Sequence, residues 1–107
     1  DIIVAKRAVK LRAKERDGVI DIKCLLSHPM ETGLRKDKKS GKIIPKHFIQ
    51  NVIAEVNGEL FMQADINSTI SKNPYLRIKV EGSKGDKVTV TWTDNMGVSG
   101  SSTEPSK

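Results

Sequence analysis

The chain has one cysteine, four aromatic residues and no long apolar run. A lone cysteine excludes an internal disulfide, so packing alone has to hold the fold together. The apolar runs reach four residues at most, far short of the about 20 that a membrane-spanning helix needs, and we expect no membrane association. At 107 residues the chain is long enough for one core and too short for two, which predicts a single domain over residues 1–107.

Patterns typical of enzymes are also missing. No serine stands in a G-x-S-x-G setting, and there is no glycine-rich phosphate-binding loop. Zinc sites normally gather three or four ligands in a recognisable cluster, whereas only His28 and Glu31 lie near each other here. We therefore expect no enzymatic activity, no cofactor and no metal site. His28 and His47 are interpreted as loop residues that form local hydrogen bonds.

Positive charge is in excess, with 19 Lys and Arg against 13 Asp and Glu and a net charge of +6. Such a surplus favours an anionic partner without naming it. Residues 34–47 form a long basic connection, which we interpret as a solvated loop or a docking surface for an acidic protein. The residues expected to act in this electrostatic docking are Arg35, Lys36, Lys38 and Lys39.

A nucleic-acid-binding β-domain is the alternative reading of this charge. Single-strand binders interleave aromatic and basic residues so that bases can stack. The patterning described next assigns Phe48 and Trp92 to the core, which leaves few aromatics for stacking. We therefore expect no nucleic-acid partner.

Apolar and polar residues alternate with a period of two along several segments, which is typical of half-buried β-strands. These segments are residues 9–11, 18–26, 59–66, 75–80 and 87–93. In the third of them, Leu60, Met62, Ala64 and Ile66 are expected to share the inner face. Between the strands, Asn57-Gly58 is the strongest hairpin signal, because both residues tolerate the positive φ of a type I′ turn. Short strands at this spacing predict an all-β sandwich or barrel.

Two segments are less regular. Residues 45–56 fit one face of a helix, or a strand whose inner face is interrupted by Gln50. The hairpin signal at residues 57–58 requires a strand before it, so we expect a strand in the second half of this segment. Residues 98–107 are rich in serine, with Val98 as the only larger apolar residue, and we expect a frayed edge or a disordered tail.

Cys24 lies on the apolar face of the expected strand 18–26, beside Ile22 and Leu26. A reactive thiol needs an exposed, electropositive setting. This position favours a small buried hydrophobic residue, with a thiol carrier that uses Cys24 as the alternative.

Two proline-containing loops follow or precede strands. Proline restricts its own φ and the residue before it, so both loops are expected to be stiff. Stiff, exposed loops with Met and Tyr suit a protein interface, because ordering them on binding costs little entropy; ordinary turn chemistry explains them equally well. The candidate partner-binding residues are Pro29, Met30, Glu31, Thr32, Gly33, Asn73, Pro74 and Tyr75.

The same loops carry a resemblance to a known family. Three sets of residues are similar, in order, to the signatures of the SoxZ family, and the resemblance spans about residues 7–97. These are residues 27–33 with 35–37 and 44–45, then 64–65 with 71–76, then 91–94 with Gly97.

The resemblance implies an immunoglobulin-like β-sandwich of about seven antiparallel strands. It also implies a scaffold subunit without catalytic residues, which pairs with SoxY in a carrier of sulfur compounds. SoxY-like subunits hold thiosulfate-derived intermediates on a glycine-flanked cysteine of a C-terminal arm, and transient contact with other Sox enzymes is implied. The pair is typically exported together, which implies a periplasmic location. Residues 99–107 depart from the family pattern, because they lack the alternating apolar strand that usually ends such chains.

Overall fold

The computed structural model describes residues 3–4, 9–67 and 70–107, and this part of the chain contains β-strands and no helix. The described residues therefore include no helix long and apolar enough to cross a membrane. The strands are β1 (Ile3–Val4), β2 (Val9–Arg16), β3 (Val19–Leu26), β4 (Ile49–Val56), β5 (Glu59–Asp65), β6 (Tyr75–Glu81), β7 (Lys87–Asp94) and β8 (Val98–Pro105).

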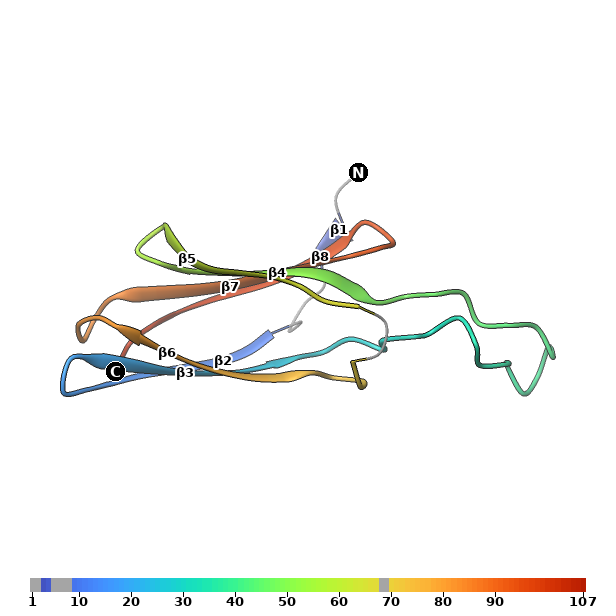
Figure 1. Cartoon of the computed structure of the whole chain (residues 1–107), viewed down its shortest axis with the longest axis horizontal. Helices are drawn as coiled ribbons and strands as arrows, with labels where there is room; N and C mark the ends of the chain where they lie inside the picture. Colours follow the sequence, from blue (N-terminus) through green and yellow to red (C-terminus); the bar gives the residue numbers. More distant parts are fainter. Residues whose placement is uncertain (1–2, 5–8, 68–69) are drawn as a thin grey trace.

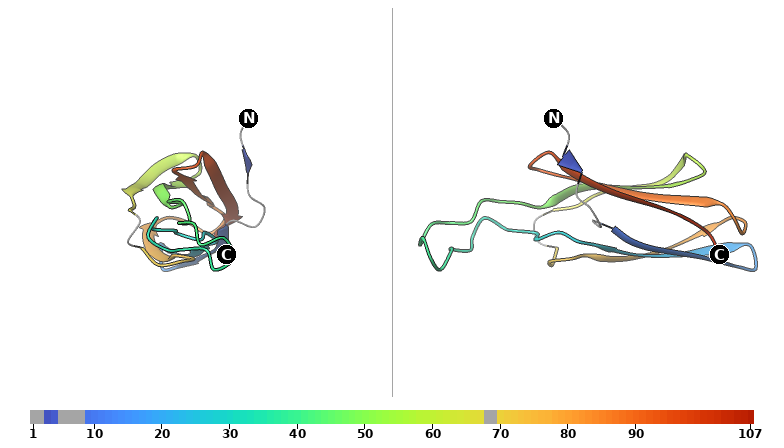
Figure 2. Two further views of the ribbon diagram at one scale, coloured as in Figure 1. Left: turned by 90° about the vertical axis from the view of Figure 1, so that its right-hand side faces the viewer. Right: turned by 180° about the vertical axis from the view of Figure 1, so that it is seen from behind.

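The strands form two stacked sheets (Figures 1 and 2). One sheet has the order β1-β8-β7-β4-β5 and the other the order β2-β3-β6. Neighbouring strands are antiparallel, except that the short β1 runs parallel to β8. This arrangement confirms the predicted all-β, immunoglobulin-like sandwich of about seven antiparallel strands.

The core lies between the sheets and is built from the inward positions of the alternating strands. Its largest fully buried side chains are Trp92, Ile20, Ile22, Leu26, Ile49, Val52, Val88, Val90 and Cys24. Asn57 and Gly58, with φ of 53° and 81°, form the hairpin turn expected between β4 and β5. The period-two pattern therefore predicted most of the core directly.

Two bulges account for the places where simple alternation fails. In β4 the register shifts between Ile49 and Asn51, so that Ile49 faces the core together with Val52 while Gln50 stays exposed. This segment is a strand, and Gln50 interrupts the pattern because the strand carries one extra residue there. A second register shift, between β4 and β5 at residues 54–55 of β4, leaves Leu60 53% exposed. The expectation that Leu60 lies on the inner face of β5 was therefore wrong.

Residues 98–105 form strand β8, so the expected frayed or disordered tail was wrong. Backbone pairing with β7 runs from Ser99 to Pro105, and side-chain hydrogen bonds join Thr89 to Thr103 and Thr91 to Ser101, each at 2.9 Å. Polar cross-strand pairs and the backbone ladder stabilise this strand in place of apolar burial. Hydrophobic alternation could not reveal a strand held in this way.

The two long sides of the sandwich differ. On one side β8 packs against β2, and the backbone of Lys107 exchanges hydrogen bonds with Ala13 and Glu15. On the other side β5 and β6 are the edge strands of their sheets and are not paired to each other. The end of the sandwich carries a long hairpin, residues 31–47, which extends well beyond both sheets (Figure 1).

Candidate functional site

The two proline-containing loops, far apart in sequence, lie side by side. The amide of His28 donates to Oδ1 of Asn73 at 3.0 Å, and the amide of Asn73 donates to the carbonyl of His28 at 2.9 Å. A further bond of 2.8 Å runs from the amide of Leu26 to the carbonyl of Pro74. The fold therefore brings both sets of candidate partner-binding residues to one end of the sandwich.

The candidate residues in these loops differ in exposure. Pro29 and Asn73 are exposed, Tyr75 is 59% exposed, and Glu31, Thr32 and Gly33 are half-buried. Met30 is only 5% exposed and packs in the core, and Pro74 is buried as well. The expectation that Met30 offers an exposed apolar contact was wrong. Its φ of 50° turns the loop inward and places Sδ 3.4 Å from the amide of Ile49.

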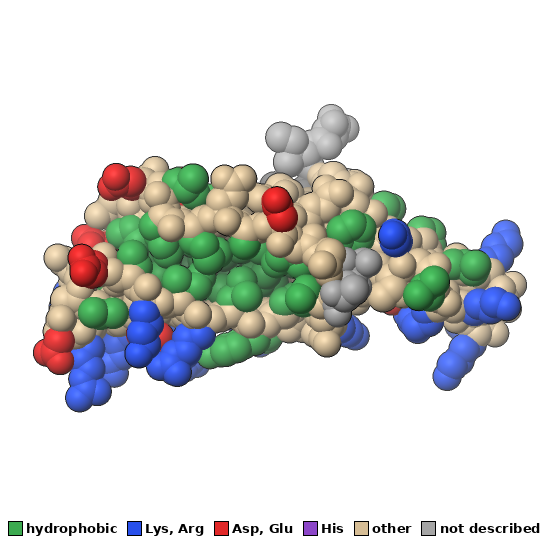
Figure 3. Space-filling model, in the orientation of Figure 1, with side chains coloured by type: hydrophobic (Ala, Val, Ile, Leu, Met, Phe, Trp, Pro, Cys, Tyr) green, Lys and Arg blue, Asp and Glu red, His purple; other side chains and the backbone are tan. Residues whose placement is uncertain are grey.

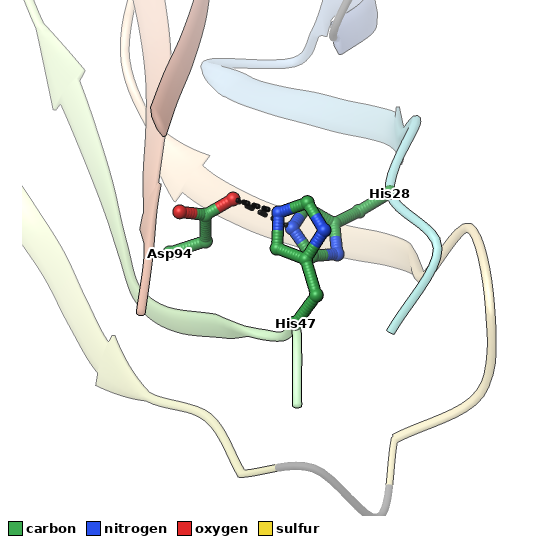
Figure 4. A group of neighbouring side chains, drawn as sticks. All are labelled: His28, His47 and Asp94. Atoms are coloured by element: carbon green, nitrogen blue, oxygen red, sulfur yellow. Dashed lines mark hydrogen bonds and ion pairs between the residues drawn. The ribbon is translucent and has the colours of Figure 1, made fainter. Parts of the chain in front are cut away.

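Three polar side chains converge below these loops (Figure 4). His28 follows β3, His47 precedes β4, and Asp94 is the last residue of β7. Nε2 of His28 lies 2.9 Å, and Nε2 of His47 2.7 Å, from the same Oδ2 of Asp94. The other oxygen, Oδ1, accepts the amides of Met96 and Val98, each at 2.9 Å. We call this the His28–Asp94–His47 network; the expectation that the histidines bond only locally was wrong.

Local geometry fixes the proton position on His28. The amide of Met30 donates to Nδ1 of His28 at 3.0 Å, so Nδ1 is an acceptor and the proton of the neutral ring sits on Nε2. That Nε2–H then donates to Asp94. Burial lowers the pKa of His28, outweighing the opposing hydrogen bond to Asp94, and the ring stays neutral.

Burial also acts on Asp94, whose side chain is fully buried. Burial is the largest single influence on the pKa of Asp94 and raises it. The hydrogen bonds from His28, Val98, His47 and Met96 lower this pKa and together outweigh burial. The pKa of Asp94 therefore lies below its ordinary value of 3.8. A buried carboxylate with four donors is a strong structural anchor for the loops that supply them.

Ligand atoms of the network lie within 4.8 Å of one another, which is close enough to consider a metal ion. A metal on Nε2 of His28 would have to displace the proton that binds Asp94 and move it to Nδ1, where the amide of Met30 already donates. The donor set is thus arranged for hydrogen bonding. We interpret the network as a clamp that joins the ends of β3 and β7 to the start of β4.

The hairpin of residues 31–47, which we call the basic hairpin, begins at this clamp. Backbone bonds between Glu31 and His47 close its base, and Arg35 binds Glu31 with a shortest contact of 2.7 Å. That ion pair is the main cause of the lowered pKa of Glu31. The exposed cations of the basic hairpin are Arg35, Lys36, Lys38, Lys39, Lys42 and Lys46.

An apolar depression follows the unpaired side of the sandwich. We call it the β5–β6 groove, and its largest section has a volume of about 660 Å³. The apolar side chains that line this section are Met62, Ala64, Ile66, Ile70, Leu76 and Ile78, with Tyr75 at its end. Figure 3 shows the corresponding apolar surface as a continuous patch between the two sheets.

Cys24 is 1% exposed and faces the core. Burial raises the pKa of its thiol to about 11, so the nucleophilic thiolate is scarce at neutral pH. The structure therefore supports the interpretation of Cys24 as a packing residue.

Sequence reasoning located the two loops but missed both the clamp and the groove. A signal for the clamp was available, because Asp94 continues the inward parity of Val88, Val90 and Trp92 and so places a charge on an apolar face. A charge in such a position needs buried partners. The groove could not be predicted in the same way, because the sequence of an apolar strand face does not show whether another part of the fold covers that face.

The family model described as sulphur oxidation protein SoxZ matches residues 9–105. No curated protein sequence matches the chain significantly.

Solved structures share the fold at low sequence identity. The sulfur carrier protein SoxY from Chlorobium limicola f thiosulfatophilum has a TM-score of 0.62 and 11% identity, covering 100% of this chain and 84% of that one. Hypothetical protein PH1083 from Pyrococcus horikoshii OT3 has a TM-score of 0.66 and 10% identity, covering 99% and 96%. A superoxide reductase (neelaredoxin) from Ignicoccus hospitalis has a TM-score of 0.66 and 12% identity, covering 99% and 93%. At such identities these likenesses describe the fold alone.

Proposed function

The chain belongs to the SoxZ family of sulphur oxidation proteins, and from this premise we propose that it is the non-catalytic subunit of a sulfur carrier. In this proposal it pairs with a SoxY protein, whose cysteine holds thiosulfate-derived intermediates while this chain acts as a rigid scaffold. The pair works in the periplasm and meets the other Sox enzymes transiently.

The observation that carries this proposal is the β5–β6 groove. It exposes apolar side chains beside two unpaired strand edges, including Tyr75 of β6 at 59% and Ile70 of the segment between β5 and β6 at 42%. Contiguous apolar surface of this kind marks interaction sites, and an edge strand offers backbone groups to a partner strand. We propose the SoxY subunit as the occupant of this groove.

The burial of Cys24 supports a carrier in which the SoxY subunit, and not this chain, supplies the reactive thiol. A carrier thiol has to reach several enzymes in turn, which requires an exposed cysteine with an accessible thiolate. The one cysteine of this chain is buried, with its thiol pKa raised to about 11, so the working thiol has to come from the partner.

The two proline-containing loops then serve pairing in different ways. Tyr75 and Asn73 offer direct contacts at the end of the groove. Met30 and the clamp act from inside by holding the loop of residues 28–33 in place. The basic hairpin lies apart from the groove and steers acidic Sox enzymes toward the pair, an effect that salt would weaken.

Co-expression with a SoxY subunit tests the pairing surface. Ile70→Asp and Tyr75→Asp change exposed side chains, so the fold should tolerate them, and each should weaken co-purification by about tenfold or more. Met96→Asp is the matched control, because Met96 is 57% exposed and lies outside the groove. Unchanged pairing by both groove variants, or an equal loss in the control, would contradict the proposed surface.

A further inference from the structure

The outer face of the sheet β2-β3-β6 concentrates positive charge. Its exposed cations alternate with the core residues along the three strands; they are Lys10, Arg12, Lys14, Arg16, Lys23, Arg77 and Lys79. We call this surface the basic face. Only Asp21 and Glu81 bring negative charge to it, so its surplus of five positive charges nearly equals the net charge of +6 of the whole chain.

The strand register places several of these charges directly opposite one another on neighbouring strands. Arg12 lies opposite Lys23 across β2 and β3, and Lys23 lies opposite Arg77 across β3 and β6. Three cations therefore occupy one row across the sheet. Lys14 and Lys79 flank Asp21 in the next row. Like charges directly opposite each other destabilise a sheet, so folding alone gives no reason for this row.

The basic face is also largely unneutralised. Among the described residues, only Arg77 of the seven cations forms an ion pair, with Nη2 at 2.8 Å and Nε at 3.1 Å from the two oxygens of Asp21. That pair shows how a guanidinium on this face binds a carboxylate with two hydrogen bonds. Arg12 presents the same group with no such partner in the described part of the chain.

The shape of the basic face suits a broad partner. Strands about 4.8 Å apart and rows two residues apart give a surface about 10 Å wide and about 20 Å long. One open depression on this face is lined by residues that include Lys10, Arg12, Lys23, Leu25 and Tyr75, and another by Lys14, Arg16 and Asp21. Tyr75 is the only aromatic residue on the face, whereas single-stranded nucleic acids are bound by repeated aromatic stacking.

We propose that the basic face is a docking surface for the acidic surface of a partner protein. It adjoins the β5–β6 groove along β6, where Tyr75 and Arg77 border the groove. Its cations attract carboxylates over the width of the sheet, and the central row of Arg12, Lys23 and Arg77 contributes most. This docking does not require the proposed pairing with SoxY, since it rests on charge instead of apolar surface, and Arg12 and Lys23 lie outside the lining of the groove.

Labelled poly-L-glutamate serves as the acidic probe, with fluorescence anisotropy measured on the 107-residue chain between about 50 and 200 mM salt. The row variant is Arg12→Gln with Lys23→Gln. The control variant, Lys84→Gln with Lys87→Gln, removes the same charge from exposed positions outside the face. Loss of two surface ion pairs of ordinary strength predicts a Kd about five- to tenfold higher for the row variant. The control should change by about twofold or less.

A selective loss of affinity for poly-L-glutamate in the row variant, with urea midpoints and SoxY pairing unchanged, supports the docking surface. Equal losses in both variants would show that net charge alone matters and would overturn it. So would absence of probe binding at low salt, or tighter binding of a thymidine oligonucleotide than of poly-L-glutamate of the same charge, which would instead mark a nucleic-acid surface.

Discussion

Replacing Asp94 by Asn removes the charge at the centre of the clamp while keeping the side-chain volume. The carboxylate accepts four hydrogen bonds, two from histidine rings and two from the amides of Met96 and Val98. An amide offers only one acceptor oxygen, so its NH₂ group must face one pair of donors. If it faces the histidines, His28 cannot adapt by switching its proton, because Nδ1 already accepts the amide of Met30.

The cost of this change follows from burial. A hydrogen bond to a charged group contributes about 1.5–3 kcal/mol, and a buried donor without a partner costs a similar amount. The side chain of His28 is 1% exposed, so the full energy of its hydrogen bond to Asp94 is lost. The side chain of His47 is 32% exposed, so water can replace part of its hydrogen bond. We therefore expect the free energy of unfolding to fall by about 3–4 kcal/mol.

Urea denaturation measures this loss. With an m-value of about 2 kcal/mol/M, the midpoint should fall by about 1.5–2 M. Asp21→Asn is the matched control, since the Asp21–Arg77 pair is solvent-exposed, with side chains 27% and 52% exposed, and should cost less than about 1 kcal/mol. Equal losses at the two positions would refute the reasoning, because the clamp would then be no stronger than a surface ion pair.

Three further predictions concern pH, the thiol and salt. Burial lowers the pKa of His28 below 6.5, so below that pH the unfolded chain binds more protons; the free energy of unfolding should fall as pH drops from about 7 to 5, and less steeply in His28→Gln. Urea titrations at several pH values check this, and an identical slope in the variant would contradict it. Cys24 should react with Ellman's reagent only in denaturant, and rapid labelling of the folded chain would show an accessible thiol. Finally, the rate of the reconstituted pathway should fall with rising salt and become less salt-dependent when the hairpin cations are neutralised; the unaltered salt dependence of such a variant would count against steering by Arg35, Lys36, Lys38 and Lys39.

The sequence predicted the sandwich well because most strands bury one face. In β3 and β7 the alternation of apolar and polar residues predicts which side chains face the core. It failed in β8, where threonine and serine pairs take the place of apolar burial, and at the bulges near Gln50 and Leu60, where one extra residue reverses the alternation.

The candidate site was less predictable because it depends on contacts between distant segments. His28, His47 and Asp94 are separated by 19 or more positions and meet only once β3, β4 and β7 are aligned. Met30 was placed on the surface because a loop position was expected to be exposed, whereas its positive φ turns it into the core. The basic face was overlooked for the opposite reason, since its cations come from three strands and no single segment is rich in them.

The central claim is that this chain supports a sulfur carrier without holding the sulfur itself. Intact-mass spectrometry of the purified pair with SoxY, after incubation with thiosulfate and the loading enzyme, tests it most directly. The account predicts a mass increase on the SoxY subunit and none on this chain. A covalent sulfur adduct on Cys24 would contradict it.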